Sequence, residues 1–415
     1  MQTTRTPTRV QRRHVLYVSG FDPRGAKQAH SLYKSESAHQ HKQSGGPSVE
    51  VGRRVKDTAG NATWTLDADL PDGPVRGRMT FLGWDDIVRA HWPQDTLRLW
   101  IDSLRTTAFN LRHGVLQRML RASYPPVVAL VTPLLLVTLV VLALLLLGAL
   151  GMAATHWLGL HWGVVAGGLL VGLAVMVAGA RALVLRFSMY WVARSYAFNA
   201  RLAQGMVPEW QPKVQAHARA LVDAVAALAN EPDAQACEVL LVGHSSGSIL
   251  AVSILAEALR IDPALARRGP AVSLLTLGQC IPMLGCFPQA DGLRQDMALL
   301  GTAEGIAWLD FSAPPDGCCF ALCDPLWACG VPLQAPRLPD RPKLLSPRFA
   351  EMFDASAYAE LRADRLKLHF QYLMSSQHPV DYDYFHITAG SQTLAERFAA
   401  LASVNDYTQL RMPRR

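Results

Sequence analysis

Short apolar runs alternate with longer helical segments along most of the chain. The runs are rich in Val, Leu and Ile and are closed by Gly, Pro, Asp or Ser, which is typical of buried strands. They cover residues 15–19, 63–66, 78–84, 239–242, 272–278 and 306–311. Residues 26–43 and 210–230 between them have the character of helices. This alternation predicts an α/β fold with a mainly parallel sheet and helices on both faces.

A different pattern interrupts the alternation in the middle of the chain. Residues 122–180 contain no Lys, Arg, Asp or Glu. Within this region, residues 127–150 and 164–183 are almost entirely apolar, and each is long enough to cross about 30 Å of hydrocarbon. The connection, residues 151–162, is short and uncharged, and its Trp157 and Trp162 are expected to be interfacial anchors. We therefore expect a two-helix transmembrane hairpin, inserted into the α/β domain.

The hairpin divides the chain into three parts. Residues 1–121 form the first part of the α/β domain, residues 122–185 the hairpin, and residues 186–415 the second part. Arginines flank the hairpin on both sides and are absent from its turn: Arg112, Arg118, Arg121, Arg181, Arg186 and Arg194. By the positive-inside rule, both termini and the α/β domain lie in the cytoplasm. This predicts a multi-pass membrane protein.

Charge and cysteine content change this picture little. The net charge of +7 is spread along the chain, so nucleic acid is not an expected partner, whereas an anionic lipid bilayer is. The seven cysteines are odd in number and all lie after residue 236. Residues 1–13 lack the apolar core of a secretory signal. Both features favour a reducing compartment. Oligomeric state is left open.

The clearest chemical pattern lies where the 239–242 run ends. Gly243-His244-Ser245-Ser246-Gly247 follows the strand and precedes an apolar segment without proline. Gly-x-Ser-x-Gly between a strand and a helix is the nucleophile-elbow pattern, which exposes a serine hydroxyl on a tight turn. Gly243 and Gly247 are needed because side chains there would collide with neighbouring backbone. We predict Ser245 as a nucleophile.

A serine nucleophile needs a base, and the base needs an acid that orients it. In chain order the acid and then the histidine follow the serine. Asp316 lies in the loop after the 306–311 strand and is preferred over Asp310 and Asp324. Three later histidines are candidates for the base: His369, His378 and His386. Their spacing does not separate them.

Several of these segments together resemble a poorly characterised group of bacterial membrane proteins with an α/β-hydrolase domain. They are the elbow, Gly20-Phe21-Asp22-Pro23-Arg24-Gly25, Trp84-Asp85-Asp86-Ile87, His369-Phe370-Gln371-Tyr372 and Asp381-Tyr382-Asp383-Tyr384-Phe385. The resemblance favours His369 as the base, with His386 as the alternative, and it implies a location in a bacterial inner membrane. In an α/β-hydrolase, the backbone N–H groups of Phe21 and Ser246 are placed to form the oxyanion hole.

Cofactor and metal signals are weak. The chain has no GxxxxGK[ST] loop and no GxGxxG after a strand, so no nucleotide cofactor is expected. Cys318, Cys319, Cys323 and Cys329 lack a paired CxxC arrangement, so no metal is expected either. Residues 325–347 hold six prolines and predict an irregular connection, which could form a lid or a plain loop.

The sequence therefore predicts a membrane-anchored serine hydrolase. Its substrate would be an ester, for example a lipid or acyl ester, cleaved through an acyl-enzyme on Ser245. Two alternatives stay open. One is a catalytically silent hydrolase-like scaffold that binds a partner at the membrane. The other is an acyltransferase that uses the same three side chains.

Overall fold

A mixed nine-stranded sheet forms the centre of the molecule in the computed structural model, which describes residues 9–92, 96–159, 161–186 and 189–404. The strands are β1 (Arg12–Val18), β2 (Val49–Val51), β3 (Val55–Lys56), β4 (Ala62–Leu70), β5 (Gly73–Phe81), β6 (Cys237–His244), β7 (Ala271–Leu277), β8 (Ile306–Phe311) and β9 (Lys343–Leu345). Their order is β2-β4-β5-β1-β6-β7-β8-β9, with β3 beside β4. The neighbours in the order β5-β1-β6-β7-β8-β9 pair in parallel, whereas β2, β3 and β5 each pair antiparallel with β4. The predicted α/β architecture with a mainly parallel sheet is confirmed.

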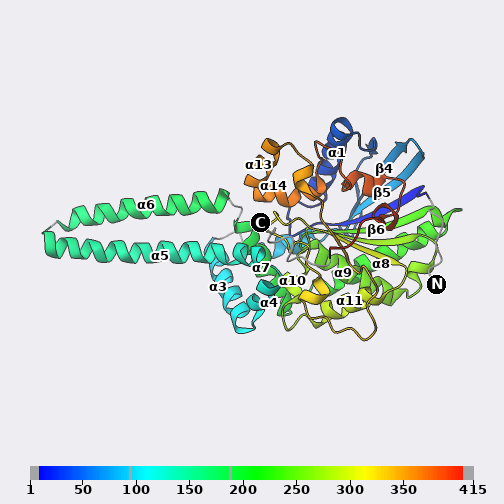
Figure 1. Ribbon diagram of the computed structural model, residues 1–415. Coiled ribbons are helices and arrows are strands. Elements are labelled where there is room, and N and C mark those ends of the chain that lie inside the picture. Colours follow the sequence, from blue (N-terminus) through cyan, green and yellow to red (C-terminus); the bar gives the residue numbers. More distant parts are fainter. Residues whose placement is uncertain (1–8, 93–95, 160, 187–188, 405–415) are drawn as a thin grey trace.

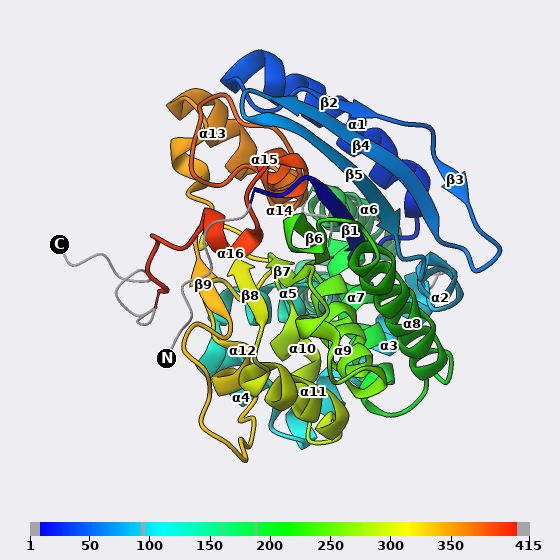
Figure 2. The same cartoon turned by 90° about the vertical axis from the view of Figure 1, so that its right-hand side faces the viewer.

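Helices cover both faces of this sheet (Figures 1 and 2). They are α1 (Gly25–Ser44), α2 (Asp85–Ala90), α3 (Thr96–Arg112), α4 (Val115–Ala122), α5 (Tyr124–Leu158), α6 (Trp162–Arg186), α7 (Met189–Ala203), α8 (Trp210–Ala229), α9 (Gly247–Ile261), α10 (Ile281–Gly285), α11 (Asp291–Thr302), α12 (Pro325–Ala328), α13 (Ala355–Ala363), α14 (Arg365–Phe370), α15 (Tyr384–Ala389) and α16 (Leu394–Arg397). The two helices expected at residues 26–43 and 210–230 are α1 and α8.

Strand β6 shows why the sheet is covered twice. Every residue of β6 is buried. Val239 and Leu241 belong to the core that includes α8 and α9, whereas Leu240 and Val242 belong to the core on the other face, which includes α1 and α13. Successive side chains of a strand point to opposite faces, so a strand buried on both faces is apolar at consecutive positions. The continuous apolar run before the Gly-x-Ser-x-Gly pattern follows from this central position.

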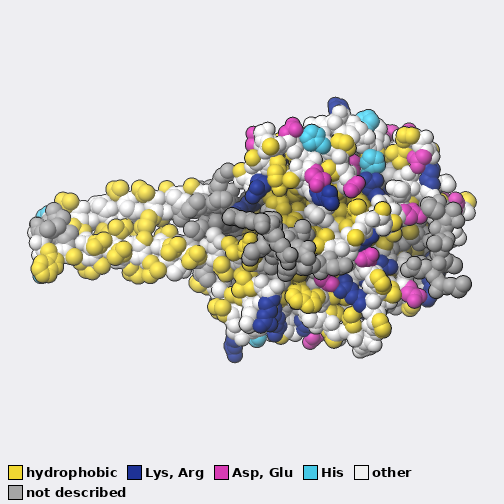
Figure 3. Space-filling view, in the orientation of Figure 1, with side chains coloured by type: hydrophobic (Ala, Val, Ile, Leu, Met, Phe, Trp, Pro, Cys, Tyr) yellow, Lys and Arg dark blue, Asp and Glu magenta, His cyan; other side chains and the backbone are white. Residues whose placement is uncertain are grey.

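The helices α5 and α6 form a long antiparallel hairpin that projects away from the sheet (Figure 1). Helix α5 has 35 residues and α6 has 25, which makes them roughly 50 Å and 40 Å long. Trp157 and Trp162 lie at its far end and are 81 % and 72 % exposed. Apolar side chains cover the hairpin surface in Figure 3. Two helices of the expected length and composition are thus present.

The hairpin begins earlier than the sequence pattern indicates. Helix α5 starts at Tyr124, and Val127 and Leu130 in its first turns are buried in the core shared with α4 and α7. The first turns of α5 therefore pack as part of the α/β domain, and the two unburied apolar windows are Thr138–Trp157 and Trp162–Gly179. A run of apolar residues does not distinguish a helix end packed against protein from one that is exposed.

Residues 325–347, expected to be irregular, contain two short elements. Asp324 caps α12 by accepting hydrogen bonds from the Leu326 and Trp327 amides. Strand β9 adds to the sheet as a parallel partner of β8. The prolines between these elements, from Pro332 to Pro342, lie in a connection without helix or strand.

Candidate active site

Ser245 occupies a sharp turn between β6 and α9. Its φ angle is +57°, in the left-handed region that non-glycine residues rarely adopt. A Cβ atom added to Gly243 would lie 2.8 Å from the Gly247 carbonyl oxygen, and one added to Gly247 would collide with the Ser19 carbonyl. Both glycines therefore allow the strand, the turn and α9 to approach one another. The strained serine has the local geometry of a nucleophile elbow.

Asp316 and His369 form a buried hydrogen-bonded pair. The His369 Nδ1 atom lies 2.7 Å from Asp316 Oδ2, and the two side chains are 7 % and 0 % exposed. The Tyr372 hydroxyl donates to the same oxygen at 3.1 Å, and the Cys318 amide donates to Oδ1 at 3.0 Å. Burial alone would raise the pKa of Asp316, but the charge and hydrogen bond of His369 outweigh burial, so its pKa is below the ordinary value. The carboxylate is thus ionised and fixed against the imidazole.

His244 links the serine turn to this pair. Its Nε2–H donates to the His369 carbonyl oxygen at 2.9 Å, and the two rings are 5.0 Å apart. Burial, followed by the charge of His369, lowers the pKa of His244 to about 3. Since Ser245 directly follows His244, this neutral imidazole fixes the turn beside the helix that carries His369.

Cys280 makes a second connection between the serine turn and the loop that carries Asp316. Its Sγ atom lies 3.7 Å from Ser245 Oγ and 3.4 Å from the carbonyl oxygen of Cys318. Cys280 follows β7, Ser245 follows β6 and Asp316 follows β8, so all three lie at the carboxyl edge of neighbouring parallel strands. This edge is where ligands bind in open α/β sheets.

The two other histidines have different carboxylate partners. His378 Nε2 lies 3.1 Å from Asp354, and His386 Nδ1 lies 2.9 Å from Asp383. His386 lies on α15, a helix capped by Asp383, and not on the terminal strand or extended segment that its sequence suggests. The described contacts of these two pairs do not include the serine turn.

The other candidate acids also have different partners. Asp310 accepts hydrogen bonds from the Thr276 and Ser312 hydroxyls, both at 2.7 Å. Its burial raises its pKa to about 7. Asp324 caps α12 and forms an ion pair with Arg337. Of the three acids considered, Asp316 is the one that contacts a candidate base.

The loop after β1 lies against Ser245. A Cβ atom added to Gly20 would be 2.9 Å from Ser245 Cβ. The next residue, Phe21, buries its ring against Trp84, Trp92 and Phe198. Among the described residues, the backbone N–H groups of Phe21 and Ser246 have no hydrogen-bond acceptor in the structure.

Asp316, Cys318 and His369 offer three donor atoms within 4.8 Å of one another, a grouping that could hold a metal ion. However, Asp316 Oδ2 and His369 Nδ1 are hydrogen-bonded to each other. Burial also raises the pKa of the Cys318 thiol well above its ordinary value, which disfavours the thiolate that a metal requires. The geometry favours a hydrogen-bonded pair over a set of metal ligands.

Three residues of this region were not singled out from the sequence: His244, Cys280 and Tyr372. Tyr372 lies within the segment that carries the family resemblance, four residues after Leu368. His244 and Cys280 become visible only when the ends of β6 and β7 are aligned in the sheet, because their contacts depend on strand neighbours.

Comparison of the chain with protein-family models, curated proteins and solved structures finds no match. The arrangement of Ser245, Asp316 and His369 is therefore interpreted from its own geometry and chemistry.

Proposed function

We propose that this protein is a membrane-anchored serine hydrolase with an α/β-hydrolase-type fold, acting on carboxylic esters. The observation that carries the proposal is a serine with φ +57° at the end of a central parallel strand. The preceding residue, His244, donates its Nε2–H to the carbonyl oxygen of His369, whose ring is hydrogen-bonded to Asp316. A strained serine turn and a buried carboxylate–imidazole pair at the same sheet edge are the parts that nucleophilic acyl transfer requires.

In the proposed mechanism, Ser245 Oγ attacks the ester carbonyl. The Nδ1 atom of His369 is engaged by Asp316, so Nε2 is the nitrogen that accepts the serine proton and returns it to the leaving alcohol. Asp316 holds the ring in this tautomer and stabilises the imidazolium. Water, activated by His369, then cleaves the acyl-enzyme and releases the acid. This yields an acid and an alcohol and regenerates the serine.

The unpaired amides of Phe21 and Ser246 suit the developing negative charge. Phe21 directly follows Gly20, whose backbone packs against the Ser245 side chain, and Ser246 directly follows Ser245 at the start of α9. Backbone donors aimed at the carbonyl oxygen stabilise the tetrahedral intermediate, and the loss of one such donor typically costs about 10²–10³ in rate. The buried Phe21 ring fixes the backbone that carries its N–H group.

The strand order supports the α/β-hydrolase assignment. The serine follows β6, which lies between β1 and β7 near the middle of the parallel region, and the acid follows β8, two strands further on. Serine, acid and histidine occur in that order along the chain, as they do in α/β-hydrolases. The loop that supplies the Phe21 amide follows β1, which is the direct neighbour of β6.

The apolar hairpin supports attachment to a bilayer. Neither of the two apolar windows of α5 and α6 is buried within the protein. The exposed side chains along them include Leu139, Leu142, Leu170 and Val175. An apolar surface of this length is unfavourable in water, whereas a hydrocarbon core of about 30 Å matches it. Both ends of the hairpin return to the same α/β domain (Figure 1), so the domain would lie on one side of the membrane.

A fluorophosphonate probe tests the hydrolase proposal directly. We expect the folded, detergent-solubilised full-length chain to form one adduct, which peptide mapping assigns to Ser245. The Ser245→Ala variant should lose it, whereas Ser35→Ala, at an exposed serine on α1, should keep it. An unlabelled Ser245 in folded protein would exclude the serine hydrolase and favour the silent scaffold.

A further inference from the structure

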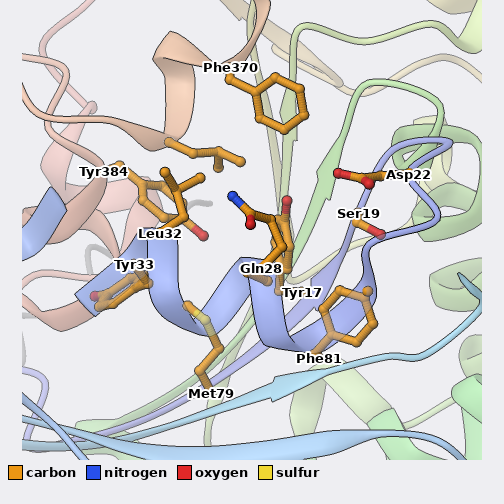
Figure 4. A pocket seen from close by; sticks show the side chains of 13 residues that line it. Tyr17, Ser19, Asp22, Gln28, Leu32, Tyr33, Met79, Phe81, Phe370 and Tyr384 are labelled. Atoms are coloured by element: carbon orange, nitrogen blue, oxygen red, sulfur yellow. The ribbon is translucent and has the colours of Figure 1, made fainter. Parts of the chain in front are cut away.

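A narrow cavity lies between β1, α1, β5 and the segment that follows His369 (Figure 4). It has an empty volume of about 480 Å³, of which only about 30 Å³ is open to the centre of a water molecule. One water needs about 10–15 Å³ by this measure. The cavity therefore suits a group of a few heavy atoms and is too narrow for a long acyl chain.

Unpartnered polar groups face this space. The Ser19 hydroxyl is fully buried, and the described residues provide no hydrogen-bond partner for it. Tyr17 and Tyr384 are 5 % and 4 % exposed, and their hydroxyls face the cavity without a hydrogen-bond partner among the described residues. Figure 4 shows the Gln28 amide and the Tyr17 and Tyr384 hydroxyls turned toward the same space. By contrast, Tyr33 in the same wall bonds to the Thr388 hydroxyl at 2.7 Å.

These unpaired groups indicate a ligand. A buried hydroxyl without a partner typically costs about 1–3 kcal/mol, and such groups are normally satisfied by protein, water or a ligand. Burial raises the pKa of both Tyr17 and Tyr384 above the ordinary value, so each is a neutral hydroxyl that can donate or accept. The cavity therefore offers several neutral hydrogen-bonding groups within a small space.

The ligand is expected to be uncharged. No Lys or Arg lines the described cavity, and the one lining carboxylate, Asp22, is bound by the Arg24 guanidinium at 2.9 and 2.7 Å. Leu32, Met79 and Phe81 supply apolar walls. Neutral polar groups within apolar walls favour a compact molecule that carries both C–H and O–H groups.

Two residues that line the cavity are chain neighbours of residues of the candidate active site. Ser19 directly precedes Gly20, whose backbone packs against the Ser245 side chain. Phe370, which lines the cavity, directly follows His369. The Arg24 guanidinium, bound to Asp22, also lies over the Phe370 ring at 5.1 Å. The cavity walls thus include the chain neighbours of Gly20, which packs against Ser245, and of His369.

We propose that this cavity binds a small, uncharged, hydroxyl-bearing part of the ester substrate. Two sources share this chemistry: a glycerol-like leaving alcohol and a hydroxylated acyl group. The inference rests on the proposed ester hydrolysis and adds the substrate class. A site that hydrogen-bonds a substrate hydroxyl discriminates strongly against the analogue that lacks it, because its own polar groups are then left unpaired.

Paired esters test this proposal in the detergent-solubilised full-length chain. One pair is glyceryl monobutyrate and propyl butyrate, which differ in the alcohol. The other is the 4-nitrophenyl ester of 3-hydroxybutyrate and that of butyrate, which differ in the acyl group. We expect kcat/KM to favour the hydroxylated member of one pair by at least about tenfold. The pair that shows the preference identifies which side of the ester occupies the cavity.

Variants then assign the preference to the cavity. Tyr17→Phe and Tyr384→Phe should each bring the ratio of kcat/KM values toward one, through loss on the hydroxylated ester. Tyr358→Phe, at a partly exposed tyrosine on α13, should keep the wild-type ratio. As a second readout that needs no turnover, the uncharged molecules glycerol or 3-hydroxybutyramide should slow fluorophosphonate labelling of Ser245 more than 1-propanol or butyramide does.

The outcomes separate this inference from the proposed function. Failure of the probe to label Ser245 contradicts the serine hydrolase itself. Labelling and hydrolysis with equal kcat/KM within both pairs leaves the hydrolase intact but overturns the substrate class, and the cavity is then a site for bound water only. A preference that survives both tyrosine substitutions also overturns the assignment to this cavity.

Discussion

At the scale of single residues, the Asp316 carboxylate accepts hydrogen bonds from His369, Tyr372 and the Cys318 amide. Asp316→Asn replaces one acceptor oxygen with a donor, so the His369 ring would no longer be held with its proton on Nδ1. If the proposed hydrolase is correct, kcat for ester hydrolysis should fall by about 10³–10⁴ with little change in KM, as the same substitution does in serine proteases. Steady-state kinetics on a butyrate ester measures it.

The chain contains a matched control for this substitution. Asp383→Asn changes the acid of the Asp383–His386 pair in the same way, and asparagine is itself a good N-cap for α15. Hydrolysis by Asp383→Asn should stay near the wild-type rate. If Asp383→Asn loses activity while Asp316→Asn retains it, His386 is the base instead of His369.

These pairs also explain what the sequence could predict at this scale. The Gly-x-Ser-x-Gly pattern predicted a strained serine turn because the constraint is local: two glycines within five residues must allow close backbone contacts. The base could not be chosen by spacing. Each of His369, His378 and His386 contacts a carboxylate, and only the fold determines which pair approaches the end of β6.

At the scale of secondary-structure elements, α8 is held against the sheet through His217. This residue is 2 % exposed, and its Nε2–H donates to the Gly83 carbonyl at 3.2 Å. Burial, followed by the charge of Lys213, lowers the pKa of His217 to about 4. Folding therefore favours the neutral imidazole of His217 over the imidazolium.

The sign of the resulting pH effect follows from linkage. With a folded-state pKa near 4 and an unfolded value near 6.5, the unfolded chain binds more protons between these two values. The contribution of His217 is fully present above pH 6.5 and is lost as pH falls toward 4. At pH 5 the loss is about 2 kcal/mol relative to pH 7.5.

His217→Gln should remove this pH dependence, because glutamine keeps a donor for Gly83 and does not titrate. We expect the free energy of unfolding of wild type to fall about 2 kcal/mol more than that of His217→Gln between pH 7.5 and pH 5. Urea unfolding in detergent at both pH values measures the difference. His378→Gln, at a histidine whose side chain is 49 % exposed, should follow wild type. Parallel pH profiles for wild type and His217→Gln would contradict the neutral buried imidazole.

Elements differed in how well the sequence predicted them. The long periodic or strongly apolar segments, such as α8 and β6, have most of their stabilising contacts along one or two continuous faces, so their pattern is visible in the chain. β2, β3 and β9 have only three, two and three residues. They form because a neighbouring strand offers free backbone N–H and C=O groups. The residues of these short strands do not themselves indicate that pairing partner.

At the scale of the whole molecule, the hairpin is inserted between two halves of one sheet. Strand β1 before the hairpin pairs in parallel with β6 after it, from Arg12↔Cys237 to Val18↔Gly243. The candidate site likewise combines the loop after β1 with the turn after β6. Any tilt of the hairpin would be transmitted through the first turns of α5, since Val127 and Leu130 are buried in the domain core.

This arrangement predicts the membrane topology. Both ends of the hairpin return to the α/β domain, so His161 at its turn should face the opposite side of the membrane from Val55 on β3. In intact bacterial cells expressing the full chain, a membrane-impermeant maleimide should label His161→Cys once the outer membrane is made permeable. Val55→Cys, 67 % exposed on the domain, should be labelled only after the inner membrane is broken, as should any reactive native cysteine.

Labelling of Val55→Cys in unbroken cells would show the orientation opposite to the one that the flanking arginines predict. Labelling of both variants only after lysis, with the chain in the soluble fraction, would show that the hairpin does not insert.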